Sequence, residues 1–183
     1  GRARAASTRA SGGDRAGAKT SLEQAIAADD TFLPARFALI QILINEKQFD
    51  AAAVQLDTAR ALRKGDLRVQ YFDAAIALDK NDLSKARDMM QQVLKRAPAH
   101  VPSLVLAGAV ELQAGQAATA EGYLRKAVSI APEHAGARKL LVRTYLGSSQ
   151  PAKALESIKP LLASDARTDP QLLLLAGETY LAN

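Results

Sequence analysis

Hydrophobic residues recur along the chain at a fixed spacing of 34 positions. An alanine, a large apolar residue four positions later and a further apolar residue three positions beyond it occur five times in this register. The first positions are Ala18, Ala52, Ala86, Ala120 and Ala154, the second are Leu22, Leu56, Met90, Leu124 and Ile158, and the third are Ala25, Ala59, Val93, Ala127 and Leu161. The spacing i, i+4, i+7 places residues on one face of an α-helix. The pattern therefore predicts one helix with a packed face in every period.

A second helix is predicted upstream of the first in each period. Apolar or small residues again recur every 34 positions, at Ile40, Ala74, Gly108, Val142 and Ala176. Short polar segments such as Asn45 to Gln48 separate the two helices, and short connections make neighbouring helices antiparallel. We call the upstream helix of each period helix A and the downstream helix B. The predicted fold is all-α and built from 34-residue helix–turn–helix units.

Prolines mark the expected ends of these helices. Pro34, Pro102 and Pro170 fall in the first turn of A helices, where the missing N–H costs little, and Pro151 opens a B helix in the same way. Two further prolines, Pro98 and Pro132, follow the ends of B helices. Pro160 lies inside a predicted B helix and is expected to kink or shorten it.

One unit carries a family resemblance clearly. Residues 101–134 read VPSLVLAGAVELQAGQAATAEGYLRKAVSIAPEH and combine Gly108, Gly115, Ala120, Tyr123, Leu124, Ala127 and Pro132. This combination resembles the tetratricopeptide repeat. Within this unit, Leu104 stands where many repeats have Trp. Two other units depart from the combination at Asp73, which replaces an apolar residue, and at Lys64, which replaces the terminal proline. The resemblance implies a right-handed α-solenoid whose A helices line a concave groove.

The register divides the chain into repeats. Full units are expected at 33–66, 67–100, 101–134 and 135–168, with a degenerate or partial unit at 1–32 and helix A alone at 169–183, all in one continuous solenoid domain. Because an apolar A helix without its B partner leaves exposed apolar surface, we expect the chain to be a piece of a longer array. Residues 1–14 are either a degenerate A helix or a disordered arginine-rich tail, and the sequence does not decide between the two.

Composition narrows the chemistry that the chain can perform. The chain has no Cys, which excludes disulfides, thiolate catalysis and Cys-based zinc sites, and no apolar run long enough to cross a membrane. Its net charge of +5 suggests a nucleic-acid partner at first. However, residues 1–20 carry five basic groups and one acid, and the rest of the chain carries 19 basic and 18 acidic groups. The repeat array is therefore nearly neutral, which disfavours nucleic acid as the partner.

The sequence offers no set of residues for catalysis. Its two histidines, His100 and His134, occupy equivalent turns of successive repeats. They are interpreted as solvated turn residues rather than a metal pair, because no carboxylates accompany them at ligand spacing. No phosphate-binding glycine loop or hydrolase motif is present. We predict a non-enzymatic protein with no cofactor and no metal.

Binding residues follow from the family resemblance. In tetratricopeptide repeats, five positions of helix A face the groove, and they are occupied here by Phe37, Gln41, Ile44, Tyr71, Leu78, Val105, Leu112, Lys139, Arg143 and Tyr180 among others. An apolar groove with a basic end suits a protein or peptide partner that carries acidic residues. Alternatively, Phe37 and Tyr71 only pack against adjacent helices. A chaperone-type carboxylate clamp is absent, because its Lys and Asn positions hold residues such as Phe37 and Tyr71.

A narrower resemblance concerns the biological setting. The phrases LPAR, HVPSLVLAGAVELQAGQ and QPAKAL are similar to the large bacterial tetratricopeptide proteins of the PEP-CTERM/exosortase system, which accompanies exopolysaccharide export. This resemblance implies an envelope or periplasmic location and an envelope or secretion component as the partner. We predict a protein-binding scaffold. The alternatives are a self-associating spacer that joins through open solenoid ends, and a module that binds an anionic polysaccharide or nucleic acid.

Overall fold

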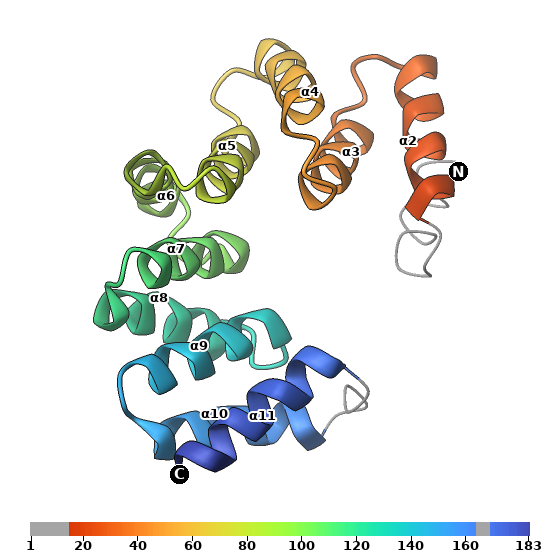
Figure 1. Cartoon of the computed structure of the whole chain (residues 1–183). Helices are drawn as coiled ribbons and strands as arrows, with labels where there is room; N and C mark the ends of the chain where they lie inside the picture. The colour runs from red at the N-terminus through yellow and green to blue at the C-terminus, as the bar shows by residue number, and fades with distance from the viewer. Residues whose placement is uncertain (1–14, 164–168) are drawn as a thin grey trace. The chain divides into compact units, whose positions relative to one another are not determined.

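The computed structural model describes residues 15–163 and 169–183, and within these ranges every regular element is an α-helix (Figure 1). The helices are Arg15–Ala28 (α2), Leu33–Asn45 (α3), Phe49–Leu62 (α4), Leu67–Asp79 (α5), Leu83–Arg96 (α6), Val101–Gln113 (α7), Ala117–Ile130 (α8), Ala135–Gly147 (α9), Pro151–Ala163 (α10) and Pro170–Ala182 (α11). The two interpretations of residues 1–14 lie outside the described residues.

The observed helices follow the predicted register. Four A helices, α3, α5, α7 and α9, begin at equivalent positions of successive repeats, and each has 13 residues. Pro34, Pro102 and Pro170 lie in the first turn of their helices, as expected. The prediction of an all-α solenoid of helix pairs is confirmed. Helix α10 begins at Pro151 and continues through Pro160 to Ala163, so Pro160 does not end it.

The chain divides into two compact units, residues 1–80 and 81–183. In the described part of unit 1, helix α3 packs against α2, α4 and α5. In unit 2, α7 packs against α6, α8 and α9, while α9 also packs against α8, α10 and α11. The A helices α3 and α7 thus each contact the B helix of their own repeat, the B helix of the preceding repeat and the A helix of the next repeat.

The alanines of the repeat pattern are buried completely, and the large residues four positions later are nearly so. The closest approach occurs between α7 and α8. A Cβ atom built on Gly108 would lie 2.5 Å from Cγ of Leu124, which is a distance that real Cβ contacts do not show. Gly108 therefore allows Leu124 to insert against the backbone of α7.

The turns between A and B helices share one backbone conformation. An equivalent residue in each turn has a positive φ: Lys47 at 59°, Asn81 at 61°, Gly115 at 73° and Ser149 at 55°. A glycine occupies only one of these four positions. The left-handed conformation disfavours residues that carry a Cβ. Gly115 and Asn81 are of the types that visit this conformation readily, whereas at Lys47 and Ser149 the flanking structure must offset its cost.

Candidate functional site

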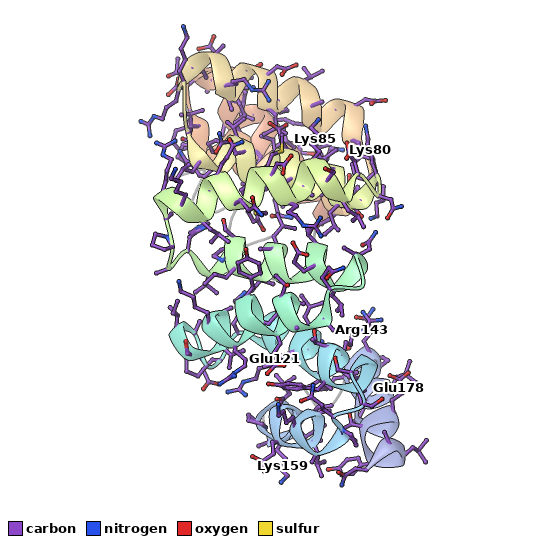
Figure 2. The ribbon with its side chains drawn as sticks, turned by 90° about the vertical axis from the view of Figure 1, so that its left-hand side faces the viewer. Lys80, Lys85, Glu121, Arg143, Lys159 and Glu178 are labelled. Carbon is purple, nitrogen blue, oxygen red and sulfur yellow. The ribbon has the colours of Figure 1, made fainter. Side chains whose placement is uncertain are left out.

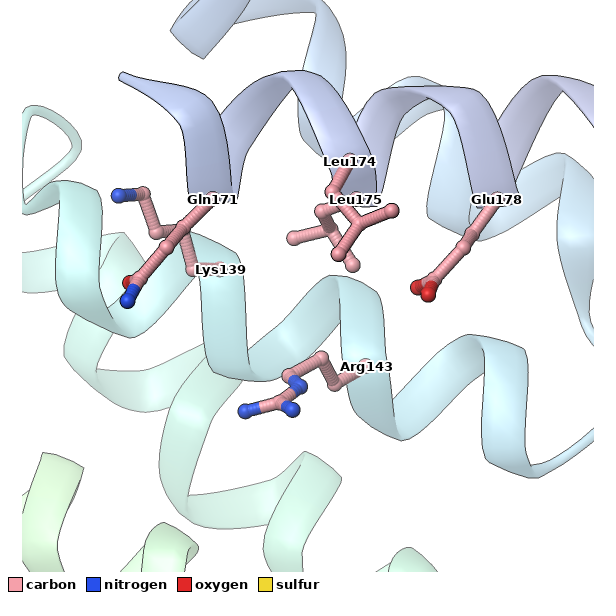
Figure 3. Close-up of a pocket in the computed structure, with 6 residues that line it drawn as sticks. All are labelled: Lys139, Arg143, Gln171, Leu174, Leu175 and Glu178. Atoms are coloured by element: carbon pink, nitrogen blue, oxygen red, sulfur yellow. The ribbon is translucent and has the colours of Figure 1, made fainter.

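Unit 2 contains a cleft between α9 and α11, with a volume of about 310 Å³. Six residues line it, namely Lys139, Arg143, Gln171, Leu174, Leu175 and Glu178, and Figure 3 shows them on both helices. Because the cleft combines two cations, one carboxylate and two leucines, it can bind a segment with both apolar and charged side chains.

Helical periodicity brings these residues together. Lys139 and Arg143 are four residues apart on α9, which places them on one face. On α11, Gln171, Leu174 and Glu178 follow the i, i+3, i+7 spacing of a single helical stripe. The packing of α9 against α11 then sets the two stripes opposite each other.

Lys139 is already engaged by the fold. Its ammonium donates to a carboxylate oxygen of Asp169, the residue that caps the start of α11 by accepting the backbone N–H of Gln171 at 2.9 Å. The hydrogen bond from Lys139 holds the pKa of Asp169 below its ordinary value, and the backbone N–H groups of Gln171 and Leu172 add to this effect. Asp169 is therefore ionised at neutral pH, and its charge balances that of Lys139.

Arg143 is the second cation that lines the cleft. Its side chain is exposed, and within the described residues no carboxylate lies at ion-pair distance from its guanidinium. Glu178 is likewise exposed and has no cation at that distance in the same part of the chain. Figure 2 shows both side chains on the same side of unit 2.

The floor of the cleft is apolar. Leu175 is 6% exposed and belongs to the core shared by α9, α10 and α11, whereas Leu174 is 67% exposed at the edge of the cleft. An exposed leucine beside an available cation offers a partner both apolar area and charge. This pairing is the chief chemical feature of the cleft.

The predicted binding residues of unit 1 are arranged differently. Phe37 is 6% exposed, stacks on Phe72 with 5.8 Å between ring centroids, and is covered by the Arg68 guanidinium 4.1 Å from its ring. Phe37 is therefore enclosed by its neighbours within unit 1. Ile44 is also buried. Tyr71 is half-buried, and burial raises the pKa of its hydroxyl.

The remaining predicted residues lie at the surface or at its edge. In unit 1, Gln41 is exposed and donates to Asn45 at 3.1 Å, and Leu78 is half-buried. In unit 2, Val105 and Leu112 are half-buried against core residues. Tyr180 is exposed on α11, outside the set of residues that line the cleft. Of the predicted set, only Lys139 and Arg143 meet in the cleft.

Four residues of the cleft were not among the predicted ones: Gln171, Leu174, Leu175 and Glu178. On α11, the helix A positions that face the groove in tetratricopeptide repeats are occupied by Leu173 and Tyr180, which lie on a different face of the helix. A search for the stripe of α11 that faces the preceding A helix would have found the missing residues, since they follow the i, i+3, i+4, i+7 spacing.

Buried charged groups elsewhere are held by structural contacts. Glu111 on α7 accepts two hydrogen bonds from Arg87 on α6, each 2.7 Å long. Arg36 on α3 donates to Gln55 and to the carbonyl oxygen of Asp30. Groups engaged in this way are suited to joining helices rather than to acid–base chemistry.

The two histidines lie at the starts of helices. His134 precedes α9, and its Nδ1 accepts the backbone N–H of Ala137 at 3.1 Å, while Nδ1 of His100 lies 2.8 Å from the Ser103 hydroxyl at the start of α7. The side chain of His134 thus caps the start of α9, whereas that of His100 contacts the Ser103 side chain and does not cap the backbone of α7. Among the residues that the structure describes, no group of three or more His, Asp or Glu side chains is placed to hold a metal ion.

Comparison with protein families identifies the repeat. Two models described as tetratricopeptide repeat match the chain, one at residues 10–76 and 111–182 and the other at residues 72–135. No match was found among curated protein sequences. In the described ranges, no helix has the length and apolarity needed to cross a bilayer.

Solved structures show the same fold at low sequence identity. A thermophilic tetratricopeptide repeat protein of Thermus thermophilus is 19% identical, with a TM-score of 0.83 over 98% of this chain and 97% of its own. PilF of Pseudomonas aeruginosa is 17% identical, with a TM-score of 0.71 over 98% and 82%. YrrB, described as having an unusual peptide-binding site, is 15% identical, with a TM-score of 0.58 over 88% and 92%.

Proposed function

The chain belongs to the tetratricopeptide repeat family, and from this premise we propose that it is a non-catalytic scaffold whose A helices bind an acidic segment of a partner protein. Repeats of this family generally mediate binding between proteins, and YrrB provides an example with a peptide-binding site. The proposal for this chain assigns the segment to the cleft between α9 and α11.

The observation that carries the proposal is the available cation Arg143 beside the exposed Leu174. A carboxylate of the partner would complete the ion pair that Arg143 lacks within the described residues, and an apolar side chain would cover Leu174. Charged pairs across an interface chiefly provide specificity and association rate, whereas the apolar contact adds affinity. A segment with an acidic residue next to an apolar one satisfies both requirements.

Replacing Arg143 with glutamate is the direct test. An array of short peptides that vary in acidic and apolar residues would first select binders of the wild-type protein. Arg143→Glu should weaken the acidic binders roughly tenfold or more, because it removes an attraction and adds a repulsion. Fluorescence polarisation measures the change in Kd.

The matched control is Lys159→Glu, which makes the same charge change on α10, away from Arg143 and Glu178 (Figure 2). Its side chain is exposed and pairs only loosely with Glu156, at 3.7 Å. The control should leave Kd within about twofold of wild type, as expected for a screened, exposed charge. Equal affinities for wild type and Arg143→Glu, or an array without binders, would refute the proposal.

The A helices of unit 1 are proposed to carry a binding surface of that unit, and α7 is proposed to contribute to the binding surface of unit 2. Gln41, Tyr71 and Leu78 offer exposed or half-buried side chains in unit 1, as Val105 and Leu112 do on α7. The buried Phe37 and Ile44 would support the surface of unit 1 from beneath. This part of the proposal rests on the helix A positions that face the groove in tetratricopeptide repeats.

The proposed biological setting is a bacterial envelope system linked to exopolysaccharide export. Support comes from the phrases LPAR, HVPSLVLAGAVELQAGQ and QPAKAL, which resemble the tetratricopeptide proteins of the PEP-CTERM system. The partner would then be another envelope or secretion component. The acidic segment that fits the cleft is the feature to look for in such a component.

Self-association is a second candidate, and the exposed face of α11 favours it. Leu173, Leu174, Tyr180 and Leu181 all point largely to solvent on this helix, and contiguous apolar surface of this kind is typical of interaction sites. Light scattering over a range of concentrations should show a rising mass if copies join through α11, and Leu174→Ser with Leu181→Ser should abolish the rise. A constant monomer mass would exclude this candidate.

A further inference from the structure

We propose that the cleft between α9 and α11 selects its segment by the order of charges along it. An acidic side chain binds at the Arg143 end, an apolar side chain covers Leu174, and a basic side chain binds at the Glu178 end. This inference rests on the proposed function, because it specifies the segment that the same cleft binds. It adds Glu178 as a residue that determines specificity.

The two available charges lie toward opposite ends of the cleft. Figure 3 shows the Arg143 side chain extending toward Gln171, away from Glu178, with Leu174 and Leu175 between these two α11 residues. The Lys139 ammonium points out of this row, toward the start of α11 where it meets Asp169. The cleft therefore presents one positive end, an apolar middle and one negative end.

The distance between the positive and negative ends of the cleft determines how far apart the acidic and basic residues of the bound segment must be. Gln171 and Glu178 are seven residues apart on α11, which corresponds to roughly 10 Å along the helix axis. An extended peptide rises about 3.3 Å per residue, so the same length spans about three peptide steps. The acidic and basic residues of an extended segment are therefore expected at positions i and i+3.

An extended segment fits the cleft better than a helix does. The cleft measures about 310 Å³, which is at the small end of the range for ligand sites. A helix with its side chains is about 10 Å across and would rest on the rim instead of entering. A few side chains of an extended peptide fill such a volume.

The cleft lining offers one positive and one negative charge to a partner, and for this reason the order of charged residues in the segment affects binding. With Lys139 neutralised by Asp169, the lining contributes one cation and one carboxylate that lack ion-pair partners within the described residues. A uniformly acidic segment would gain from Arg143 but place a like charge against Glu178, and like charges at close range are unfavourable. A segment with one acidic and one basic residue avoids this repulsion.

Three peptides that differ at one position test the inference. Each carries an aspartate, a leucine and an alanine, followed by lysine, alanine or aspartate, and each is synthesised in both chain directions with blocked ends. In the better direction, the wild-type protein should bind the lysine peptide several-fold more tightly than the alanine peptide, and the aspartate peptide most weakly. Glu178→Lys should reverse this order.

The matched control is Glu156→Lys, the same charge change at an exposed carboxylate on α10, and it should keep the wild-type order. If the last residue has no effect on Kd in wild type and Glu178→Lys, while Arg143→Glu still weakens binding, the inference is wrong and the proposed function stands. If no peptide binds to the wild-type protein, the proposed function and the inference both fail.

Discussion

Replacing Leu124 with alanine is expected to lower the free energy of unfolding by about 3–5 kcal/mol. Leu124 is fully buried and inserts against α7 where Gly108 has no side chain. On the α7 side its neighbour is therefore backbone, which cannot rotate into the space that the leucine leaves. A residual cavity is the expected result, and the cost of such substitutions rises with cavity volume.

Denaturant unfolding followed by far-ultraviolet circular dichroism measures this loss. The control is Leu181→Ala, which removes the same atoms from a side chain that is 91% exposed. It should change the free energy of unfolding by no more than about 0.5 kcal/mol. A similar small effect for both variants would show that Leu124 does not hold α7 and α8 together.

The second large effect is expected when Gly108 is replaced by leucine. Even the first added carbon would lie 2.5 Å from Cγ of Leu124 and 2.7 Å from its Cδ2. Because Leu124 is completely buried, relief requires α7 and α8 to move apart. We expect a loss of about 3 kcal/mol in the free energy of unfolding, at the upper end for overpacked cores.

A double variant separates steric conflict from other causes. Gly108→Leu combined with Leu124→Ala moves the large side chain from one helix to the other and leaves the total volume similar. The double variant should be more stable than the sum of the two single losses predicts, by about 1–3 kcal/mol. Strictly additive losses in the same denaturant experiment would contradict a direct contact between the two positions.

The sequence was sufficient to predict the helices and their packed faces. Its repeat period places alanines such as Ala120 and large residues such as Leu124 at fixed positions, and such periodicity depends only on local geometry. The prolines strengthened the assignment, because proline, as at Pro102 and Pro170, is favoured at a helix start and disfavoured in a helix centre. The effect of Pro160 was harder to predict, since α10 continues through it to Ala163.

The cleft could be predicted only in part, because its lining depends on contacts between distant residues. Lys139 and Arg143 occupy comparable positions of one helix face, but in the part of the chain that the structure describes only Lys139 meets a carboxylate, that of Asp169 in the next repeat. Phe37 has a groove position by its register, yet Phe72 and Arg68 cover it. Neither contact follows from helix periodicity, which fixes faces but not the reach of long side chains.

The shared turn conformation has a consequence for how the repeats diverge. Lysine, asparagine, glycine and serine all occupy the same left-handed position, at Lys47, Asn81, Gly115 and Ser149. A non-glycine residue there carries a strain of roughly 1 kcal/mol or more, which the flanking helices must offset. Copies of the unit can therefore accumulate substitutions at this position while keeping the same backbone, as long as their helices pack well. Substitutions at this turn position are thus tolerated only as far as the packing between the helices offsets their strain.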